Sequence, residues 1–235
     1  MKYSLILLQR GGSELSSIRE IKSSTSMPID LAEKIGINGI NEILDVFWVA
    51  YHALLESPRC NISVNTNEDY ITQEWFLFVQ RIWFSQNRAT LAFLSPVHQY
   101  GDTTMQQKGK SSPSIDFCFR DWNSINNSYF GAEAKNLYRK NKSKIVRYVN
   151  TGISHYTSGR YGSQSSKSAM LGYVLSGEIP NIVMQLTDAI AMTSPIENLS
   201  RMTYLTDPQY LSKHLRSSDN KEIEIFHLFF DFSHK

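Results

Sequence analysis

The chain has 235 residues, of which 41% are hydrophobic and 20% charged, and its formal net charge is +2. This composition suits an ordinary globular protein with a core of its own and excludes a disordered or fibrous chain. The two cysteines are too few for a disulfide framework or a zinc site. No run reaches the ~20 apolar residues of a membrane span, and the apolar run at residues 3–8 is too short for a secretory signal. We therefore expect a cytoplasmic protein that does not enter a membrane.

The sequence predicts a helical extension, residues 1–60, before a core over residues 61–235. Residues 9–27 are rich in Ser and Gly, which indicates a loop or an ordered arm. A helix over residues 40–55 is predicted because its apolar side chains recur with the period of one buried face. Its large aromatic residues suit either a core or an interface with a partner or a second copy of the chain, and we favour the core.

Capping residues and helix breakers mark the helix ends. Asp30 can accept hydrogen bonds from free amides at a helix start, and Gly36 and Gly39 are expected to interrupt that helix. Pro58 ends the next one, and Asn67 can cap a third. The apolar face of this third helix consists of Ile71, Trp75, Phe78, Val79 and Ile82.

The chain after these helices is predicted to contain little regular structure until residue 114. Residues 62–64, before the third helix, favour a short strand, and residues 90–94 an extended segment. Residues 95–113 contain Gly, Ser, Gln and Lys without periodicity, which indicates a mobile loop.

The pattern then changes to the two-residue period of strands. Residues 115–119 alternate apolar side chains with Asp116 and Cys118, and residues 129–135 form a second strand after a polar turn at residues 123–128. Strands interleaved with helices predict an α/β fold, with a central mixed β-sheet flanked by helices. The later strands are predicted at residues 170–175 and 223–232, and the later helices at residues 143–156 and 182–192.

Three charged residues in this region form the main candidate site. Asp116 and Glu133 are separated by sixteen residues, and Lys135 follows two residues later. Residues two apart in a strand point the same way, so Glu133 and Lys135 project from one face. Asp116 is expected to face away from Ile115 and Phe117. If the two strands pair as a hairpin, the three charged groups converge.

These residue types suit metal-dependent hydrolysis of a phosphodiester. Two neighbouring carboxylates raise the cost of ionising each other, and a divalent cation removes that cost. Mg²⁺ or Mn²⁺ takes oxygen ligands, polarises a phosphate and lowers the pKa of a bound water. Lys135 can orient that water or stabilise the developing charge.

The pattern Pro113, Asp116, Glu133-Ala134-Lys135 resembles the PD-(D/E)xK nuclease superfamily, which includes many restriction enzymes and DNA-repair nucleases. The resemblance implies a restriction-endonuclease-like sheet. It also implies that Asp116, Glu133 and the carbonyl of Ala134 bind the metal and that Lys135 assists the attacking water. In this chain the proline lies three residues before the aspartate instead of beside it.

The superfamily often adds a carboxylate from a preceding helix, and the resemblance implies Glu68 or Glu74 for that role. We prefer Glu68, because it lies nearer the buried stripe of its helix. The segments Gly152-Ile153, Gly159-Arg160-Tyr161 and Met170–Val174 are similar to the region after the motif in uncharacterised bacterial proteins of this superfamily. Many of those are tied to restriction or anti-phage defence. The resemblance covers about residues 65–235.

A basic segment follows the motif. Residues 134–177 contain no Asp or Glu but eight Lys or Arg residues, which indicates either a surface for a polyanion or a solvated helix face. We expect it to bind nucleic acid, with DNA as the substrate. Arg160 can grip a phosphate or cap a helix end. The predicted nucleic-acid-binding residues are Arg139, Lys140, Lys142, Lys144, Arg147, Arg160 and Lys167.

Other residues leave alternatives open. Three tyrosines in the basic segment can stack on bases, but core packing is expected for at least two of them: Tyr148, Tyr156 and Tyr161. His214 and His227 are expected to be satisfied structural residues rather than site residues.

The sequence thus predicts a metal-dependent endonuclease and leaves three alternatives. The first is a catalytically silent module that binds nucleic acid or regulates a partner. The second is a structural subunit of a defence complex. The third is a salt-bridge pattern on an unrelated α/β domain.

Overall fold

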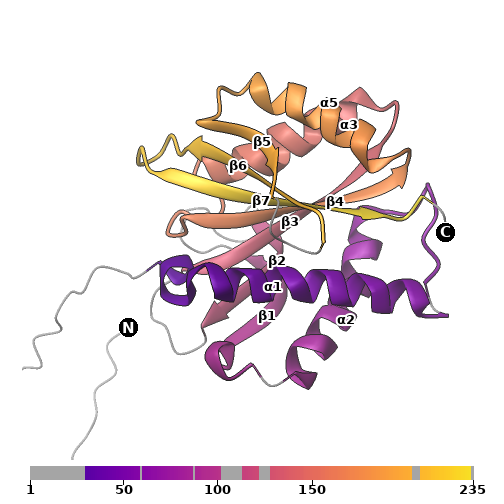
Figure 1. The fold of residues 1–235 in the computed structure, drawn as a ribbon, viewed down its shortest axis with the longest axis vertical. Coiled ribbons are helices and arrows are strands. Elements are labelled where there is room, and N and C mark those ends of the chain that lie inside the picture. The colour runs from indigo at the N-terminus through magenta and orange to yellow at the C-terminus, as the bar shows by residue number, and fades with distance from the viewer. Residues whose placement is uncertain are drawn as a thin grey trace, which may run out of the picture.

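The structure is a computed structural model, and the residues that it describes form one seven-stranded mixed sheet with helices on both faces (Figure 1). The predicted α/β class, with a central mixed sheet flanked by helices, is confirmed. The predicted arm at residues 9–27 lies outside the described residues. These are residues 30–58, 60–86, 88–101, 113–121, 128–202 and 207–233.

The sheet has the strand order β1-β2-β3-β4-β7-β6-β5. β3, β4 and β7 run parallel to one another, and the remaining neighbours are antiparallel. The strands are β1 Leu94–Gly101, β2 Ser114–Asp121, β3 Tyr129–Tyr138, β4 Lys167–Ser176, β5 Glu197–Arg201, β6 Gln209–Leu215 and β7 Glu222–Asp231. The helices are α1 Leu31–Glu56, α2 Glu68–Ser85, the 3₁₀ helix Ala89–Leu91, α3 Lys142–Arg147, the π-helix Tyr148–Ile153, α4 Ser154–Thr157 and α5 Ile179–Ala191.

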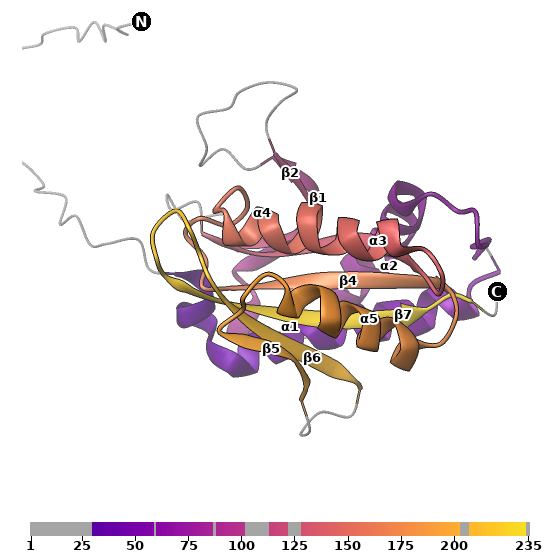
Figure 2. The same ribbon diagram turned by 90° about the horizontal axis from the view of Figure 1, so that it is seen from above.

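β2 and β3 pair as the antiparallel neighbours that the hairpin hypothesis requires. From β3 the chain passes to its parallel neighbour β4 through α3, the π-helix and α4. Parallel neighbours need such a crossover, because the chain must return to the starting edge of the sheet. Figure 2 shows α3 on one side of β4 and β7 and α1 on the other. The start of β2, together with β3 and the crossover, positions the candidate site.

α1 and α2 cover one face of the sheet through an aromatic core. The ring of Phe47 packs edge-on against Trp75 and Phe117, with centroids 5.6 and 5.2 Å apart. Trp48 and Tyr51 are only 5% and 6% exposed, so the aromatic residues of α1 belong to the core. α1 and the sheet share this one hydrophobic cluster, so the predicted boundary near residue 60 does not separate two cores.

The start of α1 follows the predicted signals in part. The side chain of Asp30 caps the helix by accepting a hydrogen bond from the amide of Ala32 at 3.0 Å. Gly36 has φ 63° and kinks the helix, as predicted. Gly39 does not interrupt it, which corrects that prediction. A Cβ at Gly39 would lie 3.2 Å from Leu91, so this glycine allows close packing.

Three predictions between α1 and β2 are wrong. Residues 62–64 form no strand, and the stretch at residues 90–94 begins as a 3₁₀ helix before β1 starts at Leu94. Residues 95–101, predicted as a loop, belong to β1, which pairs with β2. Pro96 and Gly101 hide this strand from a pattern analysis, because neither residue favours a strand by itself. The partner strand supplies the order, and residues 102–112 lie outside the described part of the chain.

The other face of the sheet carries α3, the π-helix, α4 and α5. They share a second hydrophobic cluster with the sheet, and α5 contributes the buried stripe Ile182, Leu186 and Ile190. The strands predicted at residues 170–175 and 223–232 are confirmed as β4 and β7, and the helix at residues 182–192 as α5.

Candidate active site

A fork opens where β2 separates from β3. The two strands pair from Arg120 opposite Tyr129 to Phe117 opposite Ala132, and no pairing follows beyond that point. We call this opening the fork. Asp116 lies at it, one residue past the last pair.

A carboxylate replaces backbone pairing at the fork. The amide of Ala134 points toward β2 and donates a hydrogen bond to Asp116 Oδ2 at 2.8 Å. The carbonyl of Ala134 points the same way, because amide and carbonyl of one strand residue share an edge. The Ala134 carbonyl of β3 and the Asp116 carboxylate of β2 therefore face the same opening.

Asp116 does not follow strict alternation along β2. Phe117 packs in the first hydrophobic cluster, as predicted from its position opposite to Asp116. Ile115 packs in the second cluster instead, and its Cδ1 would lie 2.4 Å from a Cβ at Gly131. This corrects the prediction that Ile115 and Phe117 share one face, opposite to Asp116. The strand is free to turn there because it no longer pairs with β3.

Glu68 enters the fork from the first turn of α2. Asn67 caps this helix, as predicted, by accepting a hydrogen bond from the amide of Asp69. Glu68 Oε2 accepts a hydrogen bond from the amide of Asn136 at 2.9 Å. Its other oxygen, Oε1, lies 3.2 Å from Lys135 Nζ. Glu68 is thus a second carboxylate that satisfies the free edge of β3.

Lys135 Nζ binds three oxygen atoms in the fork. It lies 2.7 Å from Glu133 Oε1, 2.6 Å from the carbonyl oxygen of Ala134 and 3.2 Å from Glu68 Oε1. Lys135 and Glu133 are only 5% and 6% exposed. The structure therefore brings Asp116, Glu133 and Glu68 together around the Lys135 ammonium group and the backbone of Ala134.

The buried carboxylates are electrostatically crowded. Burial and the neighbouring Asp116 raise the pKa of Glu133 to about 8, although Lys135 opposes the shift. Burial also raises the pKa of Asp116 to about 6, against the effects of Lys135 and the Ala134 amide. Burial alone would lower the pKa of Lys135, but the Glu133, Glu68 and Asp116 carboxylates outweigh it and raise that pKa. Lys135 is therefore charged at neutral pH, whereas Glu133, whose pKa lies above 7, is mostly protonated there.

The donor set fits a hard divalent cation. Glu133 Oε2 is buried and has no hydrogen-bond partner among the described residues. The predicted ligands are two carboxylates and the Ala134 carbonyl, all oxygen donors of the kind that Mg²⁺ prefers. Two of them, Glu133 and the Ala134 carbonyl, already hold one cation, the Lys135 ammonium. Within the described ranges, no group of three His, Cys, Asp or Glu side chains is arranged to hold a metal, but the predicted set has only two such side chains.

Sequence reasoning missed two residues that position Glu68. Thr72, one turn further along α2, donates a hydrogen bond to the Glu68 carbonyl at 2.9 Å and contacts the Tyr173 hydroxyl at 3.0 Å. Asn136 donates from its side chain to the Thr66 carbonyl at 3.0 Å, besides its amide bond to Glu68. The place of Thr72 four residues after Glu68 on the buried face was the available signal.

The predicted nucleic-acid-binding residues fall into two groups. Arg139, Lys140 and Lys142 are exposed. Three others contact neighbouring side chains: Arg147 Nη2 lies 3.3 Å from Glu68 Oε1, Lys144 lies over the Tyr138 ring, and Lys167 pairs with Glu224. The segment has no acidic residue of its own, but acids from α2 and β7 reach it in the fold.

The remaining residues lie in the core. Tyr148, Tyr156 and Tyr161 are at most 5% exposed, which confirms the preference for core packing over base stacking. His214 and His227 are buried and hydrogen-bonded to Ser212 on β6, so they are structural residues, as expected.

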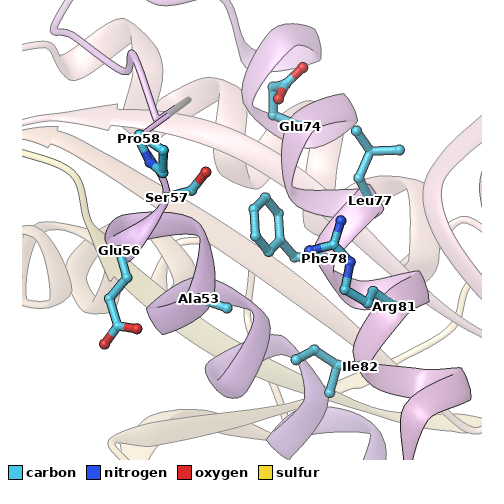
Figure 3. Close-up of a pocket in the computed structure, with 9 residues that line it drawn as sticks. All are labelled: Ala53, Glu56, Ser57, Pro58, Glu74, Leu77, Phe78, Arg81 and Ile82. Carbon is cyan, nitrogen blue, oxygen red and sulfur yellow. The ribbon is translucent and has the colours of Figure 1, made fainter.

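A groove of about 500 Å³ runs between the end of α1 and α2 (Figure 3). In this figure the ring of Phe78 lies between the two helices. Glu74 lines the groove, and none of the residues at the fork does. The alternative helix carboxylate is therefore separate from the cluster that Glu68 joins.

Comparison of the chain with family models, curated proteins and solved structures finds no match. Among the described helices, none is both long and apolar enough to cross a membrane. Any function must therefore be argued from the residues at the fork.

Proposed function

We propose that this protein is a Mg²⁺- or Mn²⁺-dependent nuclease that hydrolyses the backbone of nucleic acid, with DNA as the proposed substrate. The observation that carries the proposal is the meeting of Asp116, Glu133, Lys135 and Glu68 at the fork. A buried cluster of this charge is costly in a purely structural role. The fork between an Asp strand and a Glu-x-Lys strand is also what the PD-(D/E)xK resemblance implies, and a restriction-endonuclease-like core is part of the proposal.

Each residue has a role in this reaction. Asp116, Glu133 and the Ala134 carbonyl would hold the metal, which when bound polarises the phosphate and makes a water more acidic. Lys135 carries a full positive charge, so it donates hydrogen bonds to the attacking water or to the charge that develops on phosphate. Glu68 keeps Lys135 in place through its 3.2 Å contact.

Several exposed cations lie in the segment that follows β3 in the sequence. Arg147 is about half-exposed beside Glu68. Arg139 and Lys140 lie in the turn after β3, and Lys142 lies at the start of α3. Lysine and arginine side chains of this kind contribute phosphate contacts that weaken with salt. They suit a nucleic-acid strand that extends beyond the fork.

The test is cleavage of supercoiled plasmid and of single-stranded DNA with Mg²⁺ or Mn²⁺. Glu133→Ala is expected to lower the rate at least about 100-fold, as loss of a group that acts on the transition state does. Glu74→Ala is the matched control, because this glutamate lines the groove of Figure 3, and its rate should stay within about twofold of wild type.

The outcomes separate the candidates. Cleavage by wild type that EDTA and Glu133→Ala both abolish supports the nuclease. Equal cleavage by wild type and Glu133→Ala would contradict it. Metal binding by wild type without any cleavage would favour the catalytically silent module, in which Lys135 keeps its contacts with Glu133 and Glu68.

A further inference from the structure

The segment after α3 forms a wall of the candidate site. A Cβ at Gly152, in the π-helix, would lie 4.0 Å from Cγ of Lys135, so the helix backbone passes directly beside the lysine stem. π-helical turns of this kind often occur at functional sites. His155 follows in α4, and it lies close enough to Lys135 for the charge of the lysine to act on its ring.

Two buried tyrosines fix this turn. The hydroxyl of Tyr156 donates to the Ala169 carbonyl on β4 at 3.1 Å. The hydroxyl of Tyr161 donates at 3.0 Å to the carbonyl of Ser114, two residues before Asp116. The amide of Tyr161 donates to the carbonyl of His155 at 2.9 Å. Both ends of the turn are thus tied to strands of the sheet, one of them next to Asp116.

His155 and Arg160 occupy this turn, and each has a buried polar atom without a partner. These atoms are His155 Nδ1 and Arg160 Nε, which have no hydrogen bond among the described residues. The imidazole packs edge-on against Tyr161, with centroids 4.8 Å apart, so its orientation is fixed. Buried donors normally find a partner, and leaving one unpaired is costly.

The surroundings of His155 are positive. Burial, together with the charges of Arg160 and Lys135, lowers the pKa of His155 to about 4. The ring is therefore neutral at neutral pH and offers one N–H beside two cations. Within the described part of the chain Arg160 forms no ion pair, whereas Arg147 pairs with Glu68 and Lys167 pairs with Glu224.

We propose that His155 and Arg160 form an anion subsite beside Lys135, which binds a phosphate of the nucleic-acid strand next to the one that is cleaved. This inference rests on the proposed function and deepens it: it adds His155 as a binding residue and gives the predicted Arg160 a partner and a specific phosphate. The guanidinium fork of Arg160 and a ring N–H of His155 are donors, and the oxygens of a phosphate diester are acceptors. A bound phosphate would provide the partners that Nδ1 and Nε lack.

The experiment measures binding of a short fluorescent DNA duplex to the full chain in EDTA, where the metal is withheld. Arg160→Ala and His155→Ala are compared with Arg81→Ala, which removes an exposed cation from α2. Arg160→Ala is expected to raise Kd about tenfold and to lower the slope of log Kd against log salt by about one. His155→Ala should raise Kd about threefold without changing the slope, because it removes a neutral donor, and Arg81→Ala should change neither.

Two milder variants keep the test valid if either alanine variant fails to fold. Arg160→Lys keeps the charge but not the planar fork, so it should keep the salt slope and lose part of the affinity. His155→Gln keeps a donor and should bind more tightly than His155→Ala. Values of Kd within about twofold of wild type for all four variants, with unchanged slopes, would overturn the subsite, as would an equal loss in Arg81→Ala.

The turnover assay separates this inference from the proposed function. With Mg²⁺, the subsite predicts a higher KM for Arg160→Ala with little change in kcat. A wild-type protein that binds the duplex but never cleaves it would overturn the nuclease and leave the subsite supported by the binding data. Cleavage with values of KM and Kd that neither Arg160→Ala nor His155→Ala changes would overturn the subsite alone.

Discussion

Two buried polar clusters on the same sheet differ in how their hydrogen bonds are satisfied. In the histidine cluster, Ser212 Oγ lies 2.8 Å from Nε2 of both His214 and His227, and His227 Nδ1 lies 2.9 Å from the Tyr148 hydroxyl. Burial lowers the pKa of His227 to about 3, so its ring is neutral. The polar atoms that form these contacts are paired without any charge.

The cluster at the fork differs from the histidine cluster both in its charge and in its hydrogen bonding. It holds three acidic side chains and one ammonium, and Glu133 Oε2 is buried without a partner in the described residues. Two of its carboxyl groups, those of Asp116 and Glu133, have raised pKa values. A paired, neutral network stabilises a fold, whereas a crowded and incompletely paired one is better suited to hold a ligand.

The largest expected effect is on turnover. Lys135→Ala should lower kcat about 1,000-fold, because the charge beside the reacting phosphate disappears. The matched control is Lys144→Ala, which removes a lysine of the same segment that lies over the Tyr138 ring. Single-turnover cleavage measures both. A Lys135→Ala protein that cleaves like the control would remove the distinction between the fork and the rest of the basic segment.

The next effect is on stability. His227→Ala should lower the free energy of unfolding by about 3 kcal/mol, because it opens a cavity, leaves the Tyr148 hydroxyl without its partner and removes one of the two histidine partners of Ser212. Urea unfolding measures it, with His52→Ala, an exposed histidine, as control. Cleavage per folded molecule should not change. If His227→Ala instead abolished cleavage in a stable protein, the histidine cluster would not be merely structural.

The two clusters should respond to pH with opposite signs. The folded protein leaves His227 unprotonated down to about pH 3, whereas the unfolded chain binds this proton below about pH 6.5. The stability that this residue contributes is therefore complete above about pH 6.5 and lost as the pH falls. Folded Glu133 keeps its proton up to about pH 8, against 4.5 when unfolded, so its contribution is complete below 4.5 and lost as the pH rises through 8.

Melting temperatures in EDTA across this pH range test the difference. Glu133→Gln should flatten the loss of stability between about pH 4.5 and 8 and leave the loss of stability below pH 4.5 unchanged. His227→Gln should flatten the acid side alone. Added Mg²⁺ should raise the wild-type Tm by a few degrees, and more at about pH 8.5 than at pH 6, because the cation competes with a proton. An equal Mg²⁺ effect in Glu133→Gln would contradict the assignment of Glu133 as a ligand.

The smallest effect is expected at the rim of the fork. The side chain of Arg147 is 49% exposed, so its ion pair with Glu68 is partly screened by water. Arg147→Ala should cost about 0–1 kcal/mol of stability. It should also weaken DNA binding a few-fold. A large loss of stability would mean that Glu68 depends on Arg147 and not on Lys135 and Asn136 for its position.

The sequence alone determined the parts of this protein that depend on local pattern. The caps at Asp30 and Asn67 and the strand alternation around Glu133 and Lys135 follow from residue type and spacing, and the structure has them as predicted. These features need only contacts between residues a few positions apart. For that reason a single sequence was sufficient to place Glu133 and Lys135 on one face of β3.

Only the tertiary structure decided features that depend on distant partners. β5 and β6 are largely polar and lie at one edge of the sheet, so no alternation revealed them, and β1 exists because β2 pairs with it. The choice of Glu68 over Glu74 was decided by the free amide of Asn136, 68 residues away in sequence. The π-helix comes to lie beside the stem of Lys135, through Gly152, only because the crossover packs on this face of the sheet. Such contacts are fixed by packing between elements, which residue spacing does not encode.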